Sequence, residues 1–241
     1  MAACGSSGGG DELSRLVSQA ANEAGSSSSR MAMDLTLEGA GIPGQVKVSA
    51  SGAQDHGSRR GDYHLEVSAA DRSQRFEMRI VDGDVYLRVP GEADWQHFDA
   101  AAVGGPGSGA SDPTAALDYL RGVSGSVEDQ GTETVRGVDT RKLHADVDVG
   151  LAAQQVRGTA RGGILALQQL GVTTIPVDVW IDDQGRLRRE FATLDISNQG
   201  QQARMTITLE LFDYGVPVDV EAPPERQVVE GDPSSLGGTG A

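Results

Sequence analysis

The sequence predicts an α+β domain built on an antiparallel β-sheet with helices against one face. Apolar and polar residues alternate with a period of two in run after run from about residue 30 onward. Asp-Gly turns such as Asp82-Gly83 separate neighbouring runs, and helical spacing interrupts the strand series in only a few places. One apolar and one polar face per strand is typical of an antiparallel sheet that is solvated on one side. Grouped strands also argue against a parallel, doubly wound sheet.

Composition fits a folded, acidic protein. The chain has 241 residues, 38% of them hydrophobic and 23% charged, and its formal net charge is −15. This length suits one large β-rich domain or two small ones. Such a charge repels phosphate backbones and anionic lipid heads, so we expect neither nucleic-acid binding nor simple electrostatic adhesion to a membrane.

The first half of the chain predicts one helix and five strands. Residues 11–24 have an Asp at the cap position and apolar residues on one helical face. The five strands that follow alternate apolar and polar residues. They cover residues 31–37, 46–50, 63–69, 76–80 and 85–89.

The second half predicts a short helix, a hairpin, a longer helix and a closing meander. A Gly-rich loop at 100–111 precedes a short helix that opens at Asp112-Pro113. Residues 126–135 and 140–149 form the hairpin, and residues 151–170 form the longer helix, with a weak point at Gly162-Gly163. Strands over 177–181, 187–196 and 205–211 close the domain. We therefore divide the chain into a tether at 1–10, a domain at 11–222 and a disordered tail at 223–241.

The start of the chain carries its single cysteine. Ala2, Ala3, Cys4 and Gly5 resemble the end of a bacterial lipobox, in which the cysteine receives diacylglycerol. The Gly/Ser run that follows has the composition of a flexible tether. The charged and apolar parts of a signal peptide do not precede these residues. We expect Cys4 to be the lipidation site of the exported protein, and the alternative is a chance cysteine in a disordered start.

No motif in the sequence predicts catalysis, a metal site or a cofactor. The four histidines do not form a two-histidine helical motif, and no nucleophile elbow joins a strand to a helix. The carboxylate pairs Asp82/Asp84 and Asp182/Asp183 fall at hairpin turns, where Asp is favoured for backbone reasons. We therefore expect a protein that is not an enzyme.

The informative residues are apolar. Four methionines lie on inward strand faces, and methionine suits irregular or adaptable apolar surfaces. A closed core would use the same face, so the pattern alone leaves core packing and a ligand cavity open. If the cavity exists, its predicted lining is Met31, Met33, Leu35, Leu65, Phe76, Met78, Ile80, Leu87, Leu165, Met205 and Ile207.

Three segments resemble one family. Residues 85–87 followed by 95–99 resemble a strand and a tryptophan segment of the actinobacterial LppX/LprA/LprF/LprG-type lipoproteins, within the wider LolA/LolB/RseB-like superfamily. Residues 131–140 match the family's G-x-E-x-V-x-G-v-x-T strand and hairpin. Residues 176–182 with 185–189 resemble its Trp-Ile-Asp hairpin. The likeness runs from about residue 13 to residue 220.

The resemblance implies a strongly curved antiparallel half-barrel wrapped over helices, with an apolar cavity between sheet and helices. It also implies an envelope lipoprotein, anchored on the extracytoplasmic face of the cell membrane, that binds and carries a lipid or acylated glycolipid. A carrier must shield methylenes from water, at about 0.8 kcal/mol for each CH₂. The alternative is an RseB-like sensor that regulates a membrane partner without carrying lipid. A membrane transporter or a regulatory protein is the partner that each version implies.

Overall fold

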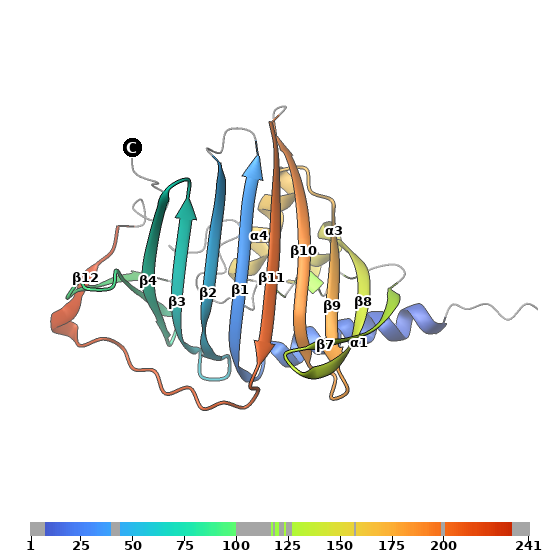
Figure 1. The fold of residues 1–241 in the computed structure, drawn as a ribbon, viewed down its shortest axis with the longest axis horizontal. Coiled ribbons are helices and arrows are strands. Elements are labelled where there is room, and N and C mark those ends of the chain that lie inside the picture. The colour runs from blue at the N-terminus through green and yellow to red at the C-terminus, as the bar shows by residue number, and fades with distance from the viewer. Residues whose placement is uncertain are drawn as a thin grey trace, which may run out of the picture.

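The computed structural model in Figure 1 describes residues 8–39, 44–99, 117, 119–120, 123, 127–156, 158–198 and 201–232. The predicted loop at 100–111, the start of the predicted helix at 112–113 and Cys4 lie outside these residues. The described residues form three α-helices, which are α1 (Gly8–Ala24), α3 (Val149–Gln155) and α4 (Gly158–Gln169). The strands are β1 (Ser28–Gly39), β2 (Gln45–Asp55), β3 (Arg60–Ala69), β4 (Arg72–Val81), β5 (Asp84–Arg88), β6 (Trp95–Asp99), β7 (Glu128–Val135), β8 (Val138–Asp148), β9 (Thr174–Asp182), β10 (Leu187–Asn198), β11 (Gln201–Phe212) and β12 (Val228–Glu230).

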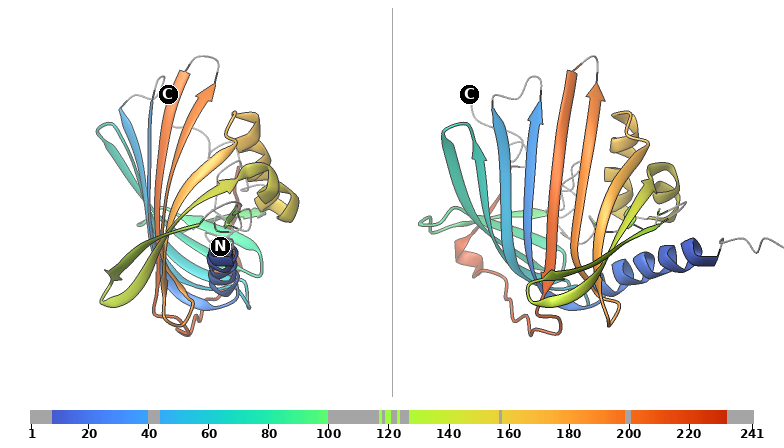
Figure 2. Two further views of the ribbon diagram at one scale, coloured as in Figure 1. Left: turned by 90° about the vertical axis from the view of Figure 1, so that its right-hand side faces the viewer. Right: turned by 45° about the vertical axis from the view of Figure 1, so that its right-hand side comes forward.

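These strands form one sheet, which confirms the predicted fold class. Its order is β12-β6-β5-β4-β3-β2-β1-β11-β10-β9-β8-β7, so the first and last long strands meet at its centre. Neighbours are antiparallel except β12 and β6, which pair in parallel. The sheet is curved and open, and α1, α3 and α4 lie on its concave side (Figure 2). Helix α1 lies against the lower ends of β9 and β10, and α3 and α4 lie toward the upper ends of β8–β10 (Figures 1 and 2).

The two faces of the sheet differ as the alternation predicts. On the convex face, cross-strand charge pairs such as Arg75–Glu66 and Arg88–Glu77 stand beside one another in register. On the concave face, Val17 and Ala20 of α1 share one core cluster with Met31 and Tyr63 of the sheet. The domain therefore closes by burying one face of the sheet.

Tyr63 is the largest side chain of the closed lower end, and two glycines make room for it. Its side chain is buried, and its hydroxyl donates a hydrogen bond to Gln54 Oε1 at 3.0 Å. A Cβ atom at Gly52, its partner in register, would lie 2.7 Å from the ring and 2.2 Å from the Asp62 carbonyl oxygen. At Gly61 a Cβ atom would lie 2.6 Å from the Tyr63 hydroxyl. The ring can pack here only because both positions lack a side chain.

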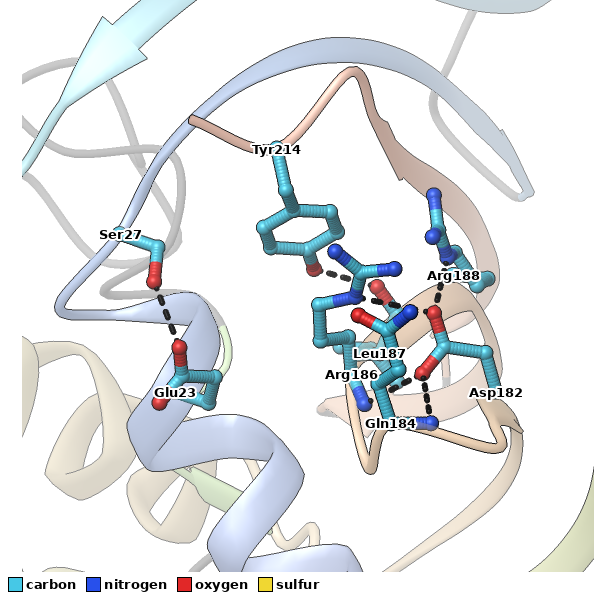
Figure 3. A network of polar contacts seen from close by, with 8 residues as sticks. All are labelled: Glu23, Ser27, Asp182, Gln184, Arg186, Leu187, Arg188 and Tyr214. Atoms are coloured by element: carbon cyan, nitrogen blue, oxygen red, sulfur yellow. Dashed lines mark hydrogen bonds and ion pairs between the residues drawn. The ribbon is translucent and has the colours of Figure 1, made fainter. Parts of the chain in front are cut away.

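A buried carboxylate fixes the turn between β9 and β10 (Figure 3). Asp182 accepts hydrogen bonds from the backbone N–H groups of Gln184 and Arg186, both at 2.9 Å, and from Arg188 Nε at 2.7 Å. Burial raises the pKa of Asp182, but these donors and the two guanidinium groups outweigh it and hold the pKa below its usual value. Tyr214 donates to the Leu187 carbonyl, which ties the segment after β11 to this turn.

Two predictions about element boundaries were wrong. The helix expected over 151–170 is two helices, and the break falls at Val156, whose backbone is extended, rather than at Gly162-Gly163. The tail expected to be disordered from residue 223 includes a 3₁₀ turn (η2, Glu225–Gln227) and strand β12. β12 pairs with β6 over Val228–Glu230, and Arg60 Nη1 donates to the Val220 carbonyl at 3.0 Å along the way. The domain therefore extends beyond residue 222.

Trp180 lies on the convex face and is covered by the β7–β8 hairpin. Its indole N–H donates a hydrogen bond to Glu133 Oε2 at 2.8 Å. Lys142 Nζ and the Arg189 guanidinium lie 5.0 and 5.3 Å from its ring centroid. Only 5% of Trp180 is exposed, so it is a packing residue.

We predict that Gly52→Ala destabilises the domain by about 2 kcal/mol or more, because the new methyl group would overlap backbone and the Tyr63 ring. Urea unfolding followed by circular dichroism measures the change. Gly162→Ala is the control, because a Cβ there meets nothing within 4 Å and helix propensity favours Ala. Equal stability of the Gly52 variant and the wild type would show that the packing around Tyr63 adapts freely.

Candidate functional site

The concave face carries four rows of side chains that run across the strands. The closed row lies at the lower end and contains Leu211, Met31, Tyr63 and Met78 in register. All four are buried, and Met31 is 0% exposed. Here the side chains of the sheet lie in the buried core cluster, to which α1 contributes Val17 and Ala20.

Burial decreases from this row toward the upper ends of the strands. The boundary row comes next, with Leu209 buried and Met33, Leu65 and Phe76 only partly buried. Two further rows, which we call the open rows, are partly exposed throughout β11, β1, β2 and β3. The open rows are Ile207, Leu35, Val48 and Val67, and then Met205, Leu37, Val46 and Ala69.

The open rows form a continuous apolar surface on the concave face of the sheet, where the helices also lie. Leu35, for example, does not belong to the buried core cluster or to the residues packed against it. Contiguous exposed apolar surface of this kind is typical of ligand-binding grooves and interaction sites in soluble domains. The geometry therefore offers a surface that an apolar molecule can cover.

The structure places the predicted lining residues in three environments. Met31, Met78 and Ile80 lie inside the closed core. Leu165 of α4 is 38% exposed, whereas its neighbours Ile164 and Leu167 meet the core. The other seven are partly buried on the concave face. They are Met33, Leu35, Leu65, Phe76, Leu87, Met205 and Ile207.

Glu190 is a candidate functional residue that no sequence motif indicated. It lies in the boundary row, between Val179 and Leu209 in register, and only 1% of it is exposed. Tyr119 donates a hydrogen bond to Glu190 Oε1. Burial raises the pKa of Glu190 to about 7, although the Tyr119 hydrogen bond acts in the opposite direction. The signal in the sequence was its parity with Ala192 and Leu194, which places it on the inward face.

A pocket of about 690 Å³ lies elsewhere among the described residues, at the upper ends of β1, β10 and β11. Its lining combines apolar surface with the charged side chains of Glu38, Asp195 and Arg204, and Arg204 Nε is paired with Asp195 at 2.7 Å. None of the predicted lining residues contributes to it. Charged side chains of this number do not favour the burial of an alkyl chain.

Ionisable groups on the convex face pair with one another. His144 Nδ1 lies 2.6 Å from Asp178, and His97 Nε2 lies 3.1 Å from Asp84. Within the described ranges, no three His, Cys, Asp or Glu side chains gather in a way that could hold a metal ion. No helix in the described part of the chain has the length and apolar character needed to cross a membrane.

We predict that Glu190 makes the protein less stable as the pH rises. In the unfolded chain its carboxyl ionises near the ordinary pKa of 4.5, whereas in the folded domain it keeps its proton up to about pH 7. The folded state therefore binds more protons between these values, and stability falls across this window by as much as about 3 kcal/mol. The stability of Glu190→Gln relative to wild type should rise from about pH 5 to about pH 8 in urea unfolding. A difference that does not change with pH would contradict the burial of this carboxyl.

Comparison with known proteins identifies the family of this chain and solved structures with a similar fold. The crystal structure of LppX from Mycobacterium tuberculosis has a TM-score of 0.56 and 18% identity, and the match covers 88% of this chain and 99% of that chain. The structure of LprF from Mycobacterium bovis has a TM-score of 0.51 and 17% identity, over 88% of this chain and 97% of that chain. No curated protein sequence matches the chain significantly. The family model of the LppX_LprAFG lipoproteins matches residues 14–220, so this chain belongs to the LppX_LprAFG lipoprotein family.

Proposed function

We propose that this protein binds a lipid or acylated glycolipid on the open rows of its concave face and carries it within the cell envelope. The observation that supports this most strongly is the gradient of burial on that face. A domain that needed only a core would cover the open rows as completely as the closed row. Here the same alternation of apolar residues continues for two more rows with side chains that stay partly exposed.

The energetics of an alkyl chain fit such a surface. Each methylene that leaves water gains about 0.8 kcal/mol, so a palmitoyl-sized chain of about fourteen methylenes gains about 11 kcal/mol when fully covered. The bound acyl chain also shields the apolar side chains of the open rows from water. Side chains such as Met33 and Met205 can follow the irregular outline of an acyl chain because methionine is flexible.

The proposed lining follows from this placement. Met33, Leu35, Leu65, Phe76, Leu87, Met205 and Ile207 contact the ligand, and Met31, Met78 and Ile80 form the floor beneath it. Leu165 of α4 covers the ligand from the helix side. This function needs binding and release but no bond making, so the proposal includes no catalytic residue and no cofactor.

Delivery to the membrane requires an anchor, because the net charge of −15 opposes adhesion to anionic lipid heads. We propose that a lipid on Cys4 supplies it. The protein then works on the extracytoplasmic face of the cell membrane. A membrane transporter or a regulatory protein would give or receive the lipid, and nucleic acid is not a partner.

We predict that Leu35→Glu strongly weakens the binding of a fluorescent fatty acid. A carboxylate in the middle of the open rows would have to be buried beneath the ligand, which costs several kcal/mol. Leu35 packs outside the core cluster, so the variant should keep its fold by circular dichroism. Fluorescence titration measures the dissociation constant, and the expected loss is at least about tenfold.

Thr36→Glu is the matched control for Leu35→Glu. Thr36 is the next residue on β1, it faces the convex side, and its partner in register is Lys47. This variant should bind the fatty acid as tightly as wild type. Equal binding by all three proteins, or no binding by wild type, would contradict a lipid site on the open rows.

We predict that Cys4→Ser moves the protein from the membrane fraction to the aqueous fraction. For this test, the wild type and the variant are both expressed in a bacterial host with a lipoprotein signal sequence added before Ala2. Detergent phase partitioning and the mass of the N-terminal peptide report the lipid. A membrane fraction that is the same for both proteins would rule out Cys4 as the anchor.

A further inference from the structure

Glu190 is a buried carboxyl on the largely apolar concave face. Its partners in register are Val179 and Leu209, and the next inward residue along β10 is Ala192. Among the described residues Tyr119 is the titratable group in contact with it, through the hydrogen bond to Oε1. The second oxygen, Oε2, is buried and has no hydrogen-bond partner in that part of the chain.

An unpartnered buried oxygen is costly. Leaving a buried acceptor without a partner costs about 1–3 kcal/mol, and more when the group is charged. A leucine at this position would remove that cost from the folded domain. Such a group therefore calls for a partner that the free protein lacks.

The location of Glu190 suggests what that partner is. The carboxyl lies in the boundary row, where the closed lower end gives way to the open rows. Leu209 alone separates it from Met33 in register, and two strand spacings amount to about 10 Å. A lipid whose acyl chain lies on the open rows can therefore bring its polar backbone to Glu190 when the side chains that cover Oε2 in the free protein move aside.

We propose that Glu190 Oε2 accepts a hydrogen bond from a hydroxyl group of the bound lipid, and that Tyr119 holds the carboxyl in place for it. The inference rests on the proposed lipid-binding function and adds a class of ligand to it. The ligand is a neutral acyl lipid with a free hydroxyl on its glycerol or sugar. A carboxylate or phosphate at this position would face Glu190 with like charge in a site of low dielectric, which is strongly unfavourable.

The test compares two ligands that differ only at the hydroxyl. One is 1,2-dioleoylglycerol, and the other is the same lipid with its free hydroxyl acetylated. Competition against a fluorescent fatty acid, at about pH 8 so that Glu190 is ionised, gives both dissociation constants. Wild type should bind the free-hydroxyl lipid about tenfold more tightly than the acetylated one.

Two variants isolate the acceptor. In Glu190→Gln the Tyr119 hydroxyl occupies the amide oxygen, so the NH₂ group faces the ligand and cannot accept a hydrogen bond. We expect this variant to bind both lipids with equal affinity while its packing is unchanged. Glu190→Leu should also lose the preference and still bind the acetylated lipid. Asp195→Asn, on the convex face of the same strand, is the control and should keep the preference.

The outcomes separate this inference from the function on which it rests. Binding of both lipids by wild type without preference would overturn the hydroxyl acceptor and leave lipid binding intact. A preference that persists in both Glu190 variants would also overturn it. Failure of wild type to bind either lipid or the fluorescent fatty acid would remove the proposed function itself, and this inference with it.

Discussion

Everything in this domain depends on the cross-strand register that keeps one face of the sheet apolar. Because β1 pairs with both β2 and β11 without a shift, the side chains of at least five strands line up in rows across the concave face. The closed row is buried in the core cluster that α1 also joins, and it is filled around Tyr63. The open rows continue the same pattern but stay partly exposed, so one face combines a core with a surface that a ligand can cover.

The anchoring of the sheet's ends explains how the open rows of β11, β1, β2 and β3 can stay partly exposed without loss of the fold. At the lower end, Asp182 ties the β9–β10 turn together, and Tyr214 joins the next segment to it (Figure 3). At the far edge, β12 covers β6, and Gly231 N–H donates to the His97 carbonyl at 2.8 Å. Stability is thus concentrated at the closed end and the edges, and the open rows remain available for binding. Glu190 lies where these two regions meet.

The sequence predicted the strands well because an alternation of apolar and polar residues has a direct structural meaning. It predicted the inward methionines for the same reason, but not which of them would be covered, since coverage depends on which segments from elsewhere in the chain pack over each row. Strand β12 escaped prediction because three residues carry too little pattern and their pairing with β6 is distant in sequence. The alternation does place Glu190 inward, yet its burial depends on Tyr119, more than seventy residues earlier. The break at Val156 was missed because Gly162-Gly163 is the stronger local signal, while α4 continues through it.

The central claim, that lipid lies on the open rows, is tested most directly by photo-crosslinking with a fatty acid that carries a diazirine along its chain. Peptide mass spectrometry then locates the adducts. The account predicts adducts on Leu35, Met205 and their neighbours in the open rows, with competition by unlabelled lipid. Adducts confined to the convex face, or to the polar pocket beside Arg204 and Asp195, would contradict it.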